Sequence, residues 1–405
     1  MTPFAPPQLP INLPKGFSFA AVAAGIKVSG RPDLALIEAA EGTTAAALFT
    51  KNLVVAAPVQ VGRASLVVSR GRVRAVLVNS GNANCATGPV GIKACREICA
   101  QTAKVLGATP AQVLPSSTGI IGVPLPAEKI ITSLPQLLAA QGGSQQHFLA
   151  FADAILTTDT RRKIASAKFS VGKKEVAVLG VAKGSGMIHP QLATMLVYIM
   201  TDIVATPAEL KAMLREACDE SFNCMSVDGD TSTNDTVALL ASGRSGVHLT
   251  DSGAKKKFTS ALRQVAQSLA DQVIQDGEGV QHIIRLHIEE AKNKAEALQI
   301  ARTISHSLLV KTAFAGADPN WGRILAAIGR AGITLDPQKI SVLIGGQIVC
   351  HNGRANGFDE KLAHEELAKP ECRLTVRLNR GRTALLFTTT DLTAEYVRIN
   401  ADYSS

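Results

Sequence analysis

The sequence predicts a layered α/β protein, and two observations support this prediction. Short runs rich in Val and Ile, typical of strands, alternate with longer stretches in which apolar residues recur at helical spacing. The chain has 405 residues, of which 46% are hydrophobic and 19% charged, which is the composition of an ordinary globular protein. Its length allows two or three domains, and no internal repeat or long Gly/Ser linker divides it.

The expected strands are six short apolar segments at 74–78, 175–181, 194–200, 340–344, 374–378 and 384–387. A Pro-rich arm at the N-terminus is expected to be extended and to precede the first regular element.

Helices are indicated by capping patterns and by spacing. The segment 206–209 reads Thr-Pro-Ala-Glu, a capping box with Pro at the first helical position, and predicts a helix to about Cys218. The segment 109–112, Thr-Pro-Ala-Gln, repeats the arrangement and predicts a second helix start. Helical spacing over 258–274 and 293–310 predicts two long amphipathic helices that face a sheet.

Charge and composition exclude several classes of protein. The formal net charge is +9, but the basic residues are scattered and only three Tyr and one Trp are available for stacking. This pattern disfavours nucleic-acid binding and fits the attraction of small anionic substrates. The seven cysteines are odd in number and lack a CxxC pair, so we expect reduced, mostly buried thiols. Because no signal peptide, transit peptide or long apolar run is visible, we expect a cytoplasmic protein without membrane contact.

Common nucleotide and metal motifs are missing from the sequence. It contains no GxxxxGK[ST], no GxGxxG after a strand, no HExxH and no GxSxG, and its eight histidines lack ligand spacing. We therefore expect no metal. An acidic, Asn-rich segment at 228–235 is suggestive of calcium, but it lacks the terminal Glu of an EF-hand, and a network of capped turns is favoured.

One segment carries a stronger signal. In KGSGMIHPQLATML (183–196), a Gly-rich stretch with Lys183 runs into a Pro, and Thr194 then begins an apolar strand. Taken alone, this Thr is a good β-former at the start of a buried strand. The whole segment, however, resembles the self-cleavage segment of the ornithine acetyltransferases, also called the bifunctional glutamate N-acetyltransferases of arginine biosynthesis.

Seven further stretches resemble this family in the same order, and together they cover essentially the whole chain. They are NSGNANCATG (79–88), SSTGIIG (116–122), TTDT (157–160), MSVDGDTSTNDTV (225–237), DGEG (276–279), KTAFAGADPNWGR (311–323) and YVRINADYSS (396–405). The sequence departs from the family's usual spelling at NCATG and at the His-Pro-Gln of 189–191, which we expect to affect only the rate of self-cleavage.

The resemblance implies an N-terminal-nucleophile-like fold built from two fragments. The chain would cut itself between Ala193 and Thr194 to give fragments 1–193 and 194–405. A Thr hydroxyl is a weak nucleophile, but an N-terminal Thr carries its own base, since an α-amino group with a pKa near 8 is partly unprotonated at neutral pH.

The resemblance also implies an activity and a set of site residues. Thr194 would take the acetyl group from N-acetylornithine and pass it to glutamate by a ping-pong, acetyl-enzyme mechanism. Thr118 and Gly119 would form the oxyanion hole. The implied substrate-binding residues are Thr157, Lys183, Thr194, Glu278, Asn400 and Ser405.

From charge, Lys183 suits the substrate carboxylate and Glu278 the ornithine ammonium, whereas Thr158 and Thr160 stay open as alternatives to Thr157. No cofactor is implied, and the family suggests a heterotetramer with two copies of each fragment. The sequence leaves open whether acetyl-CoA also serves as a donor. Two other functions also stay open: an aminopeptidase or amidase of the same fold, and a non-catalytic anion-binding protein.

Overall fold

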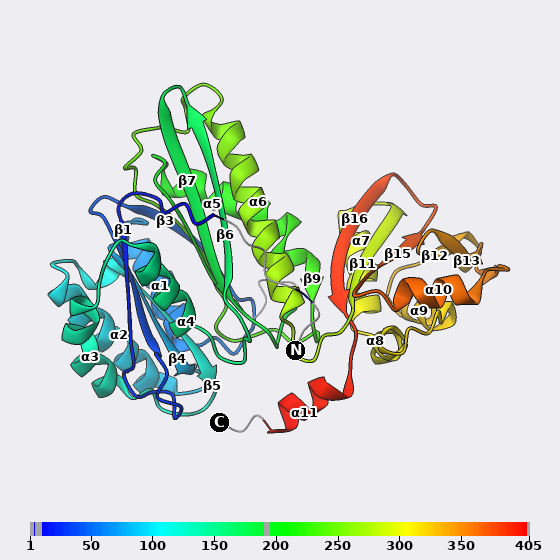
Figure 1. Ribbon diagram of the computed structural model, residues 1–405, viewed down its shortest axis with the longest axis horizontal. Coiled ribbons are helices and arrows are strands. Elements are labelled where there is room, and N and C mark those ends of the chain that lie inside the picture. Colours follow the sequence, from blue (N-terminus) through cyan, green and yellow to red (C-terminus); the bar gives the residue numbers. More distant parts are fainter. Residues whose placement is uncertain (1–3, 5–9, 190–194, 403–405) are drawn as a thin grey trace.

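The computed structural model describes residue 4 and residues 10–189 and 195–402. Its strands form three sheets, and in Figure 1 the first is blue and cyan, the second mostly green and the third mostly yellow to red. The blue strand β3 (Thr44–Phe49) belongs to the second sheet, and the green strand β9 (Met225–Ser226) belongs to the third. The first two sheets and their helices form the layers that carry the pocket described below.

The first sheet has the strand order β1-β2-β4-β5, and only the β4–β5 pair is parallel. Its strands are β1 (Phe17–Val22), β2 (Leu34–Ala39), β4 (Ala75–Asn82) and β5 (Val113–Ile120). The helices of this lobe are α1 (Ala57–Val68), α2 (Gly88–Val105), α3 (Ala127–Ala139) and α4 (Gln145–Ala154).

The second sheet has the order β3-β10-β8-β7-β6, with β8 and β10 parallel and the other pairs antiparallel. Its strands are β3 (Thr44–Phe49), β6 (Lys163–Val171), β7 (Lys174–Lys183), β8 (Leu196–Thr201) and β10 (Thr236–Ala241). Two helices cover it, α5 (Pro207–Glu220) and α6 (Ala254–Gln275).

These elements form four layers in the order helices, first sheet, second sheet and helices, and an apolar core lies between each pair of adjacent layers. One core joins α1, α2 and α3 to the first sheet through residues such as Val61, Leu36 and Leu77. A second joins the two sheets, and a third joins the second sheet to α5 and α6. Because each strand alternates its side chains between two faces, both sheets are covered on both sides. The expected layered α/β fold is confirmed.

The third sheet has the order β14-β13-β12-β15-β11-β16-β9 and a core of its own. Its strands are β9 (Met225–Ser226), β11 (Ile283–Ala291), β12 (Ser341–Ile344), β13 (Gln347–His351), β14 (Arg354–Ala355), β15 (Glu371–Arg377) and β16 (Thr383–Thr390). The helices here are α7 (Lys294–Ser305), α8 (Leu308–Ala315), α9 (Trp321–Gly329) and α10 (Glu360–Leu367).

A last helix, α11 (Ala394–Asp402), leaves the third sheet after β16 and runs back beneath the other lobes toward β5 (Figure 1). Three short 3-10 turns complete the described elements: η1 (Pro110–Gln112), η2 (Phe222–Cys224) and η3 (Pro337–Lys339).

Local sequence signals predict some of these elements. All six expected strands lie in or overlap observed strands, although part of the segment 194–200 lies outside the described residues. The capping box at Thr206 is confirmed: its backbone N–H donates to the Glu209 carboxylate at 2.8 Å, and its Oγ1 accepts from the Glu209 N–H at 3.3 Å.

Two expectations were wrong. The capping pattern at Thr109 opens only the η1 turn, because the buried Val113 and Leu114 that follow pair with β4 instead of continuing a helix. The helix expected over 293–310 is two helices, since Ser307 accepts the Val310 N–H and starts α8. The apolar spacing continues across this break because both helices bury side chains in the same core.

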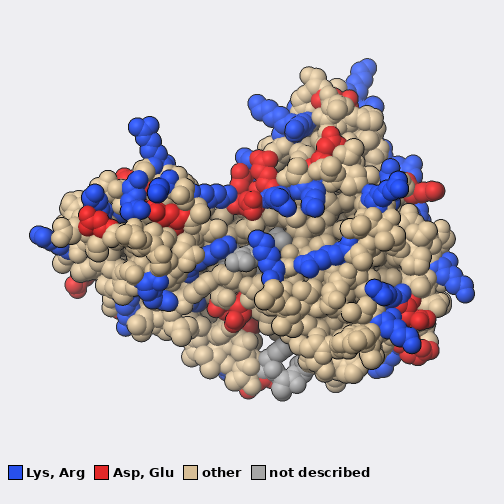
Figure 2. Space-filling model, turned by 180° about the vertical axis from the view of Figure 1, so that it is seen from behind, with Lys and Arg blue, Asp and Glu red and all other residues tan. Residues whose placement is uncertain are grey.

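All seven cysteines are buried and free, as their number and spacing predict. Among the described residues, no helix is both long and apolar enough to cross a lipid bilayer. In the face shown in Figure 2, Lys and Arg side chains are spread over several elements and interspersed with Asp and Glu, without one dominant basic patch.

Removing the α5 cap should lower stability by a defined amount. Thr206→Ala loses the acceptor for the Glu209 N–H, and we expect the free energy of unfolding to fall by about 1 kcal/mol. Urea unfolding measures this change as a lower midpoint at an unchanged slope. Thr206→Ser keeps the hydroxyl and should match the wild type, so equal losses in both variants would show that the cap is unimportant.

Candidate active site

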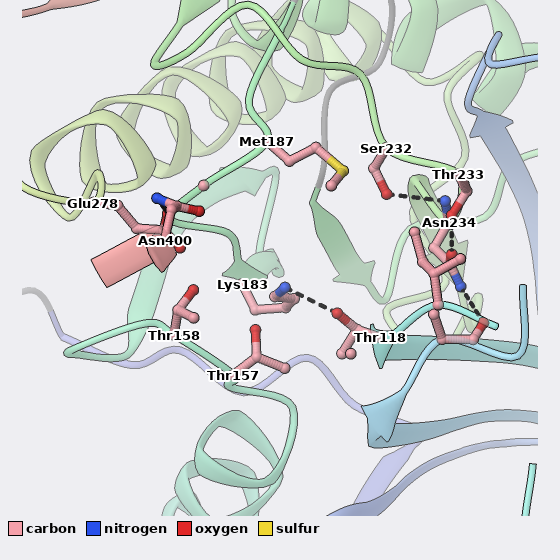
Figure 3. A pocket seen from close by; sticks show the side chains of 14 residues that line it. Thr118, Thr157, Thr158, Lys183, Met187, Ser232, Thr233, Asn234, Glu278 and Asn400 are labelled. Carbon is pink, nitrogen blue, oxygen red and sulfur yellow. Dashed lines mark hydrogen bonds between the residues drawn. The ribbon is translucent and has the colours of Figure 1, made fainter. Parts of the chain in front are cut away.

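A polar pocket lies where the ends of β5 and β7 meet the loop after α6 and the helix α11 (Figure 3). It is lined by Ala83, Thr118, Gly119, Ile121, Thr157, Thr158, Lys183, Gly186, Met187, Ser232, Thr233, Asn234, Glu278 and Asn400. Six residues expected from the sequence are among them: Thr118, Gly119, Thr157, Lys183, Glu278 and Asn400. Three other expected residues, Ala193, Thr194 and Ser405, lie outside the described residues.

The described chain borders the expected cut closely on both sides. Lys183, at the end of β7, pairs in register with Leu196 at the start of β8. Met187 lines the pocket, and Met195 is the first described residue after the gap. Its N–H donates to the carboxylate of Asp235 at 3.0 Å.

Lys183 brings a cation to the pocket beside the first sheet. Its side chain is buried, and its Nζ donates a hydrogen bond of 3.0 Å to Oγ1 of Thr118, as Figure 3 shows. Burial lowers the pKa of Lys183, and the carboxylate of Asp159 partly offsets this effect. The expected carboxylate-binding group and the expected oxyanion residue are therefore in direct contact.

A buried ion network lies next to Lys183. The Nζ of Lys163 lies 2.5 Å from Oδ1 of Asp159 and 2.6 Å from Oδ2 of Asp276, and all three side chains are fully buried. Asp159 also accepts the N–H groups of Gly184 at 2.6 Å and Thr157 at 3.1 Å. One carboxylate thus fixes both the loop that carries Thr157 and the backbone that follows Lys183.

The charge state of Asp159 follows from its partners. Burial by itself would raise the pKa of this carboxyl, but the ammonium groups of Lys163 and Lys183 outweigh burial and hold the pKa below its ordinary value. Asp159 is therefore ionised at neutral pH.

The three threonines of TTDT differ in their surroundings. Thr160 donates through both its backbone N–H (3.0 Å) and its hydroxyl to Asp276, so it belongs to the ion network. Thr157 and Thr158 line the pocket, and their side chains are seen below Lys183 and Asn400 in Figure 3.

Glu278 and Asn400 meet on the opposite side of the pocket. The Nδ2 of Asn400, on α11, donates to Oε2 of Glu278 at 2.9 Å. A Cβ on Gly186 would lie only 2.4 Å from the same carboxylate oxygen, so a glycine is needed for this approach. Gly186 therefore has a packing role, because a side chain there would displace the Glu278 carboxylate.

Gly119 occupies a position that no other residue type fits. Its φ is +131°, and a Cβ would lie 2.3 Å from the carbonyl carbon of Gly81 and 2.5 Å from the amide nitrogen of Asn82. The end of β5 can approach β4 this closely only because Gly119 has no side chain.

The structure adds residues that the sequence did not assign to the site. Ser232, Thr233 and Asn234 line the pocket from the loop between β9 and β10. Their signal was the dense run of Asp, Asn, Ser and Thr in this segment. Asp228 of the same loop accepts the N–H groups of Met187 at 2.5 Å and Ile188 at 2.9 Å.

Asp228 therefore holds the backbone of a distant segment, and it makes one contact of the capped-turn kind by accepting the Asp230 N–H at 3.2 Å. Within the described ranges, no three His, Cys, Asp or Glu side chains gather as a metal site would require.

Fold and pocket together define the class of protein: a layered α/β protein whose pocket offers an ammonium group, a carboxylate, hydroxyls and amides. Such a set is complementary to a small molecule that carries charges of both signs.

Comparisons with known proteins agree on one family. The model of the ArgJ family matches residues 18–405. The arginine biosynthesis bifunctional protein ArgJ of Methylococcus capsulatus is 44% identical over 392 residues, which are 96% of this chain and 95% of that protein. The chain belongs to the ArgJ family, and the resemblance based on its motifs is confirmed.

Two solved structures are also similar. Ornithine acetyltransferase from Mycobacterium tuberculosis, complexed with ornithine, is 35% identical and covers 44% of this chain and 94% of its own, with a TM-score of 0.39. An L-aminopeptidase D-Ala-esterase/amidase from Ochrobactrum anthropi, described as a variant of the Ntn hydrolase fold, is 11% identical and covers 69% of this chain and 90% of its own, with a TM-score of 0.41.

Loss of the Asp159 carboxylate should destabilise the protein strongly. Asp159→Asn breaks the buried ion pair with Lys163 and removes the anion that offsets the burial of Lys183, and we expect a loss of about 3–5 kcal/mol at pH 7. Because the folded pKa of Asp159 is lowered, the advantage of the wild type is complete above the unfolded pKa of about 3.9 and shrinks as the pH falls below it. Urea unfolding at pH 7 and pH 3 measures both effects.

Asp153→Asn is the matched control, since Asp153 pairs with Arg162 and both side chains are 43% exposed. It should cost about 1 kcal/mol or less. A similar loss in the two variants would contradict the importance of the buried network.

Proposed function

We propose that this chain is a self-cleaving acetyltransferase of arginine biosynthesis that moves the acetyl group of N-acetylornithine to glutamate through Thr194. The main observation in its favour is that residues from distant motifs line the same pocket. Residues implied by separate motifs, from Thr118 to Asn400, line a single pocket beside the start of β8. Membership of the ArgJ family supports the same activity.

Self-cleavage would proceed by an acyl shift. The Thr194 hydroxyl adds to the carbonyl of Ala193, the peptide C–N bond breaks, and the acyl group moves to Oγ1 while the nitrogen takes a proton. Water then hydrolyses the ester and releases fragment 1–193. The new α-amino group of Thr194 becomes the base for its own hydroxyl.

The two proposed fragments would stay together after the cut because they share a sheet. In the second sheet, β3, β6 and β7 precede the cut, and β8 and β10 follow it. Strand β8 pairs with β7 on one side and with β10 on the other. Association of two such fragment pairs as a heterotetramer is the assembly that we propose.

In transfer, Thr194 would attack the acetyl carbonyl, release ornithine and then deliver the acetyl group to glutamate. Each half-reaction passes through a tetrahedral oxyanion, and we assign its stabilisation to Thr118 and Gly119. Lys183, which donates to Thr118, is then near enough to the reacting group to bind the α-carboxylate.

Glu278 would bind the side-chain ammonium of ornithine, oriented by its hydrogen bond from Asn400. Thr157 would contribute a neutral polar contact, and Ser405 a contact from the end of the chain. The ornithine in the Mycobacterium tuberculosis structure supports a ligand of this class.

Acetyl-CoA is proposed as a second acetyl donor, a substrate and not a resident cofactor. The support for it is the name of the curated relative, a bifunctional protein of arginine biosynthesis. A cytoplasmic location is proposed on the sequence alone. The alternatives of hydrolysis and of simple anion binding have no structural observation in their favour.

The purified protein should run as two fragments, and the second should begin Thr-Met-Leu-Val. Thr194→Ala removes the hydroxyl, so it should remain one chain and be inactive. Thr194→Ser keeps a hydroxyl and should keep partial cleavage. Intact-mass analysis and terminal sequencing test this prediction, and a fully active protein that begins only with Met1 would refute the mechanism.

Glu278→Gln should separate the two half-reactions. Because glutamate has no side-chain ammonium, we expect kcat/KM to fall about ten- to a hundred-fold for N-acetylornithine and little for glutamate. Lys183→Met should weaken both, since both substrates carry an α-carboxylate. Glu395→Gln is the control, because Glu395 is paired with Arg398 on α11. Equal losses on both sides in Glu278→Gln would overturn the assignment.

A further inference from the structure

Asn234 links the loop before β10 to the strands of the expected oxyanion hole. Its Nδ2 donates to the carbonyl of Ala83 at 2.6 Å and to the carbonyl of Ser117 at 2.9 Å. Ser117 immediately precedes Thr118 on β5, and Ala83 immediately follows β4. One amide group therefore holds the two strands together at the place where Gly119 approaches β4.

The next residue, Asp235, holds the other half of the site. Its Oδ1 accepts the Met195 N–H at 3.0 Å, and the N–H of Thr236 donates to the Met195 carbonyl at 3.2 Å. The carbonyl of Asp235 accepts the Thr50 N–H at 3.1 Å, which ties the segment to the end of β3. Met195 is bonded directly to Thr194, so these contacts fix the backbone on the carboxyl side of the proposed nucleophile.

Both side chains are nearly inaccessible, with exposed fractions of 7% for Asn234 and 1% for Asp235. Within the described part of the chain, Oδ2 of Asp235 is buried without a hydrogen-bond partner. Burial raises the pKa of Asp235 well above its ordinary value, although the Met195 N–H and Lys183 oppose this shift. An Asn at this position would keep an oxygen acceptor for the Met195 N–H.

We propose that Asn234 and Asp235 are positioning residues that hold Met195, the residue after the proposed nucleophile, in place relative to the Thr118–Gly119 strand. The proposal rests on the proposed function of Thr194. Asn234 and Asp235 are neighbours joined by one planar peptide unit. Asp235 bonds Met195, and Asn234 bonds Ala83 and Ser117, so the pair links the start of β8 to the ends of β4 and β5. Oxyanion donors act only when they are already aligned with the attacked carbonyl, and a misplacement of about 1 Å can cost about a hundred-fold in rate.

Four variants test this coupling in the full-length chain. Asp235→Ala removes the acceptor for the Met195 N–H, and Asn234→Asp removes both amide hydrogens at nearly constant size. Asp235→Asn keeps an oxygen acceptor and serves as the rescue variant. Asp230→Ala is the matched control, because this exposed residue of the same loop uses only its backbone N–H in the contact with Asp228.

The measurements are the rate of self-cleavage by intact mass and the kcat and KM of the cleaved fraction, with active sites counted by trapped acetyl groups. For Asp235→Ala we expect cleavage and kcat to fall about ten- to a hundred-fold, with KM for N-acetylornithine within about threefold of the wild type. Asn234→Asp should also slow both steps, Asp235→Asn should recover most of the loss, and Asp230→Ala should equal the wild type. A fold defect alone would lower the active-site count without this split between kcat and KM.

Other results would distinguish a failure of this coupling from a failure of the proposed function. If the wild type is cleaved and transfers acetyl groups while Asp235→Ala and Asn234→Asp equal the control, the coupling is wrong and the proposed function stands. Failure of Asp235→Asn to recover activity would also overturn the coupling, because its acceptor is retained. An uncleaved, inactive wild type would instead refute the proposed function.

Discussion

The buried contact of Lys163 with Asp159 and Asp276 is the constraint on which the pocket depends. Three charges that are fully removed from water are tolerated only if each meets an opposite charge and further hydrogen bonds. Asp159 meets this requirement with the backbone N–H groups of Thr157 and Gly184, and Asp276 meets it with Thr160. The need to satisfy buried charge thereby determines where Lys183 and the threonine loop lie.

The second sheet holds the segment that follows the proposed cut. Its central strand, β8, lies between β7 and β10, so its first residues are held from both sides. The proposed nucleophile, Thr194, comes just before this strand and would therefore be attached to a strand that is paired along both edges. The proposed oxyanion residues, Thr118 and Gly119, belong to the first sheet, which packs on the second through a shared apolar core.

Local signals predicted the elements that depend on local physics. The strands and the α5 cap follow from side-chain periodicity and from hydrogen bonds within one turn. The division between α7 and α8 did not, because apolar spacing continues through His306 and Ser307 and only the Ser307 cap marks the new start. At Thr109 the cap was real, but strand pairing of Val113 decided what followed.

The site was predicted in part, for a similar reason. Motifs recognised as whole stretches identified Thr118, Lys183 and Glu278, which the structure brings to one pocket. Asp159 and Asn234 were not assigned because their importance depends on distant partners. Asn234 bonds residues 151 and 117 positions away, and no pattern in its own segment shows this.

The chain order of the pocket also has a consequence for the timing of biosynthesis. Its lining begins at Ala83 and ends at Asn400, so the pocket is incomplete until the chain has been synthesised as far as Asn400. Domains generally fold in order of emergence, and the first sheet can form long before α11 exists. A growing chain that reaches beyond Thr194 but lacks β10 also lacks Asn234 and Asp235. If Thr194 cuts the chain as proposed, and if the cut depends on these two residues, self-cleavage waits until β10 has been made, and an unfinished chain remains in one piece.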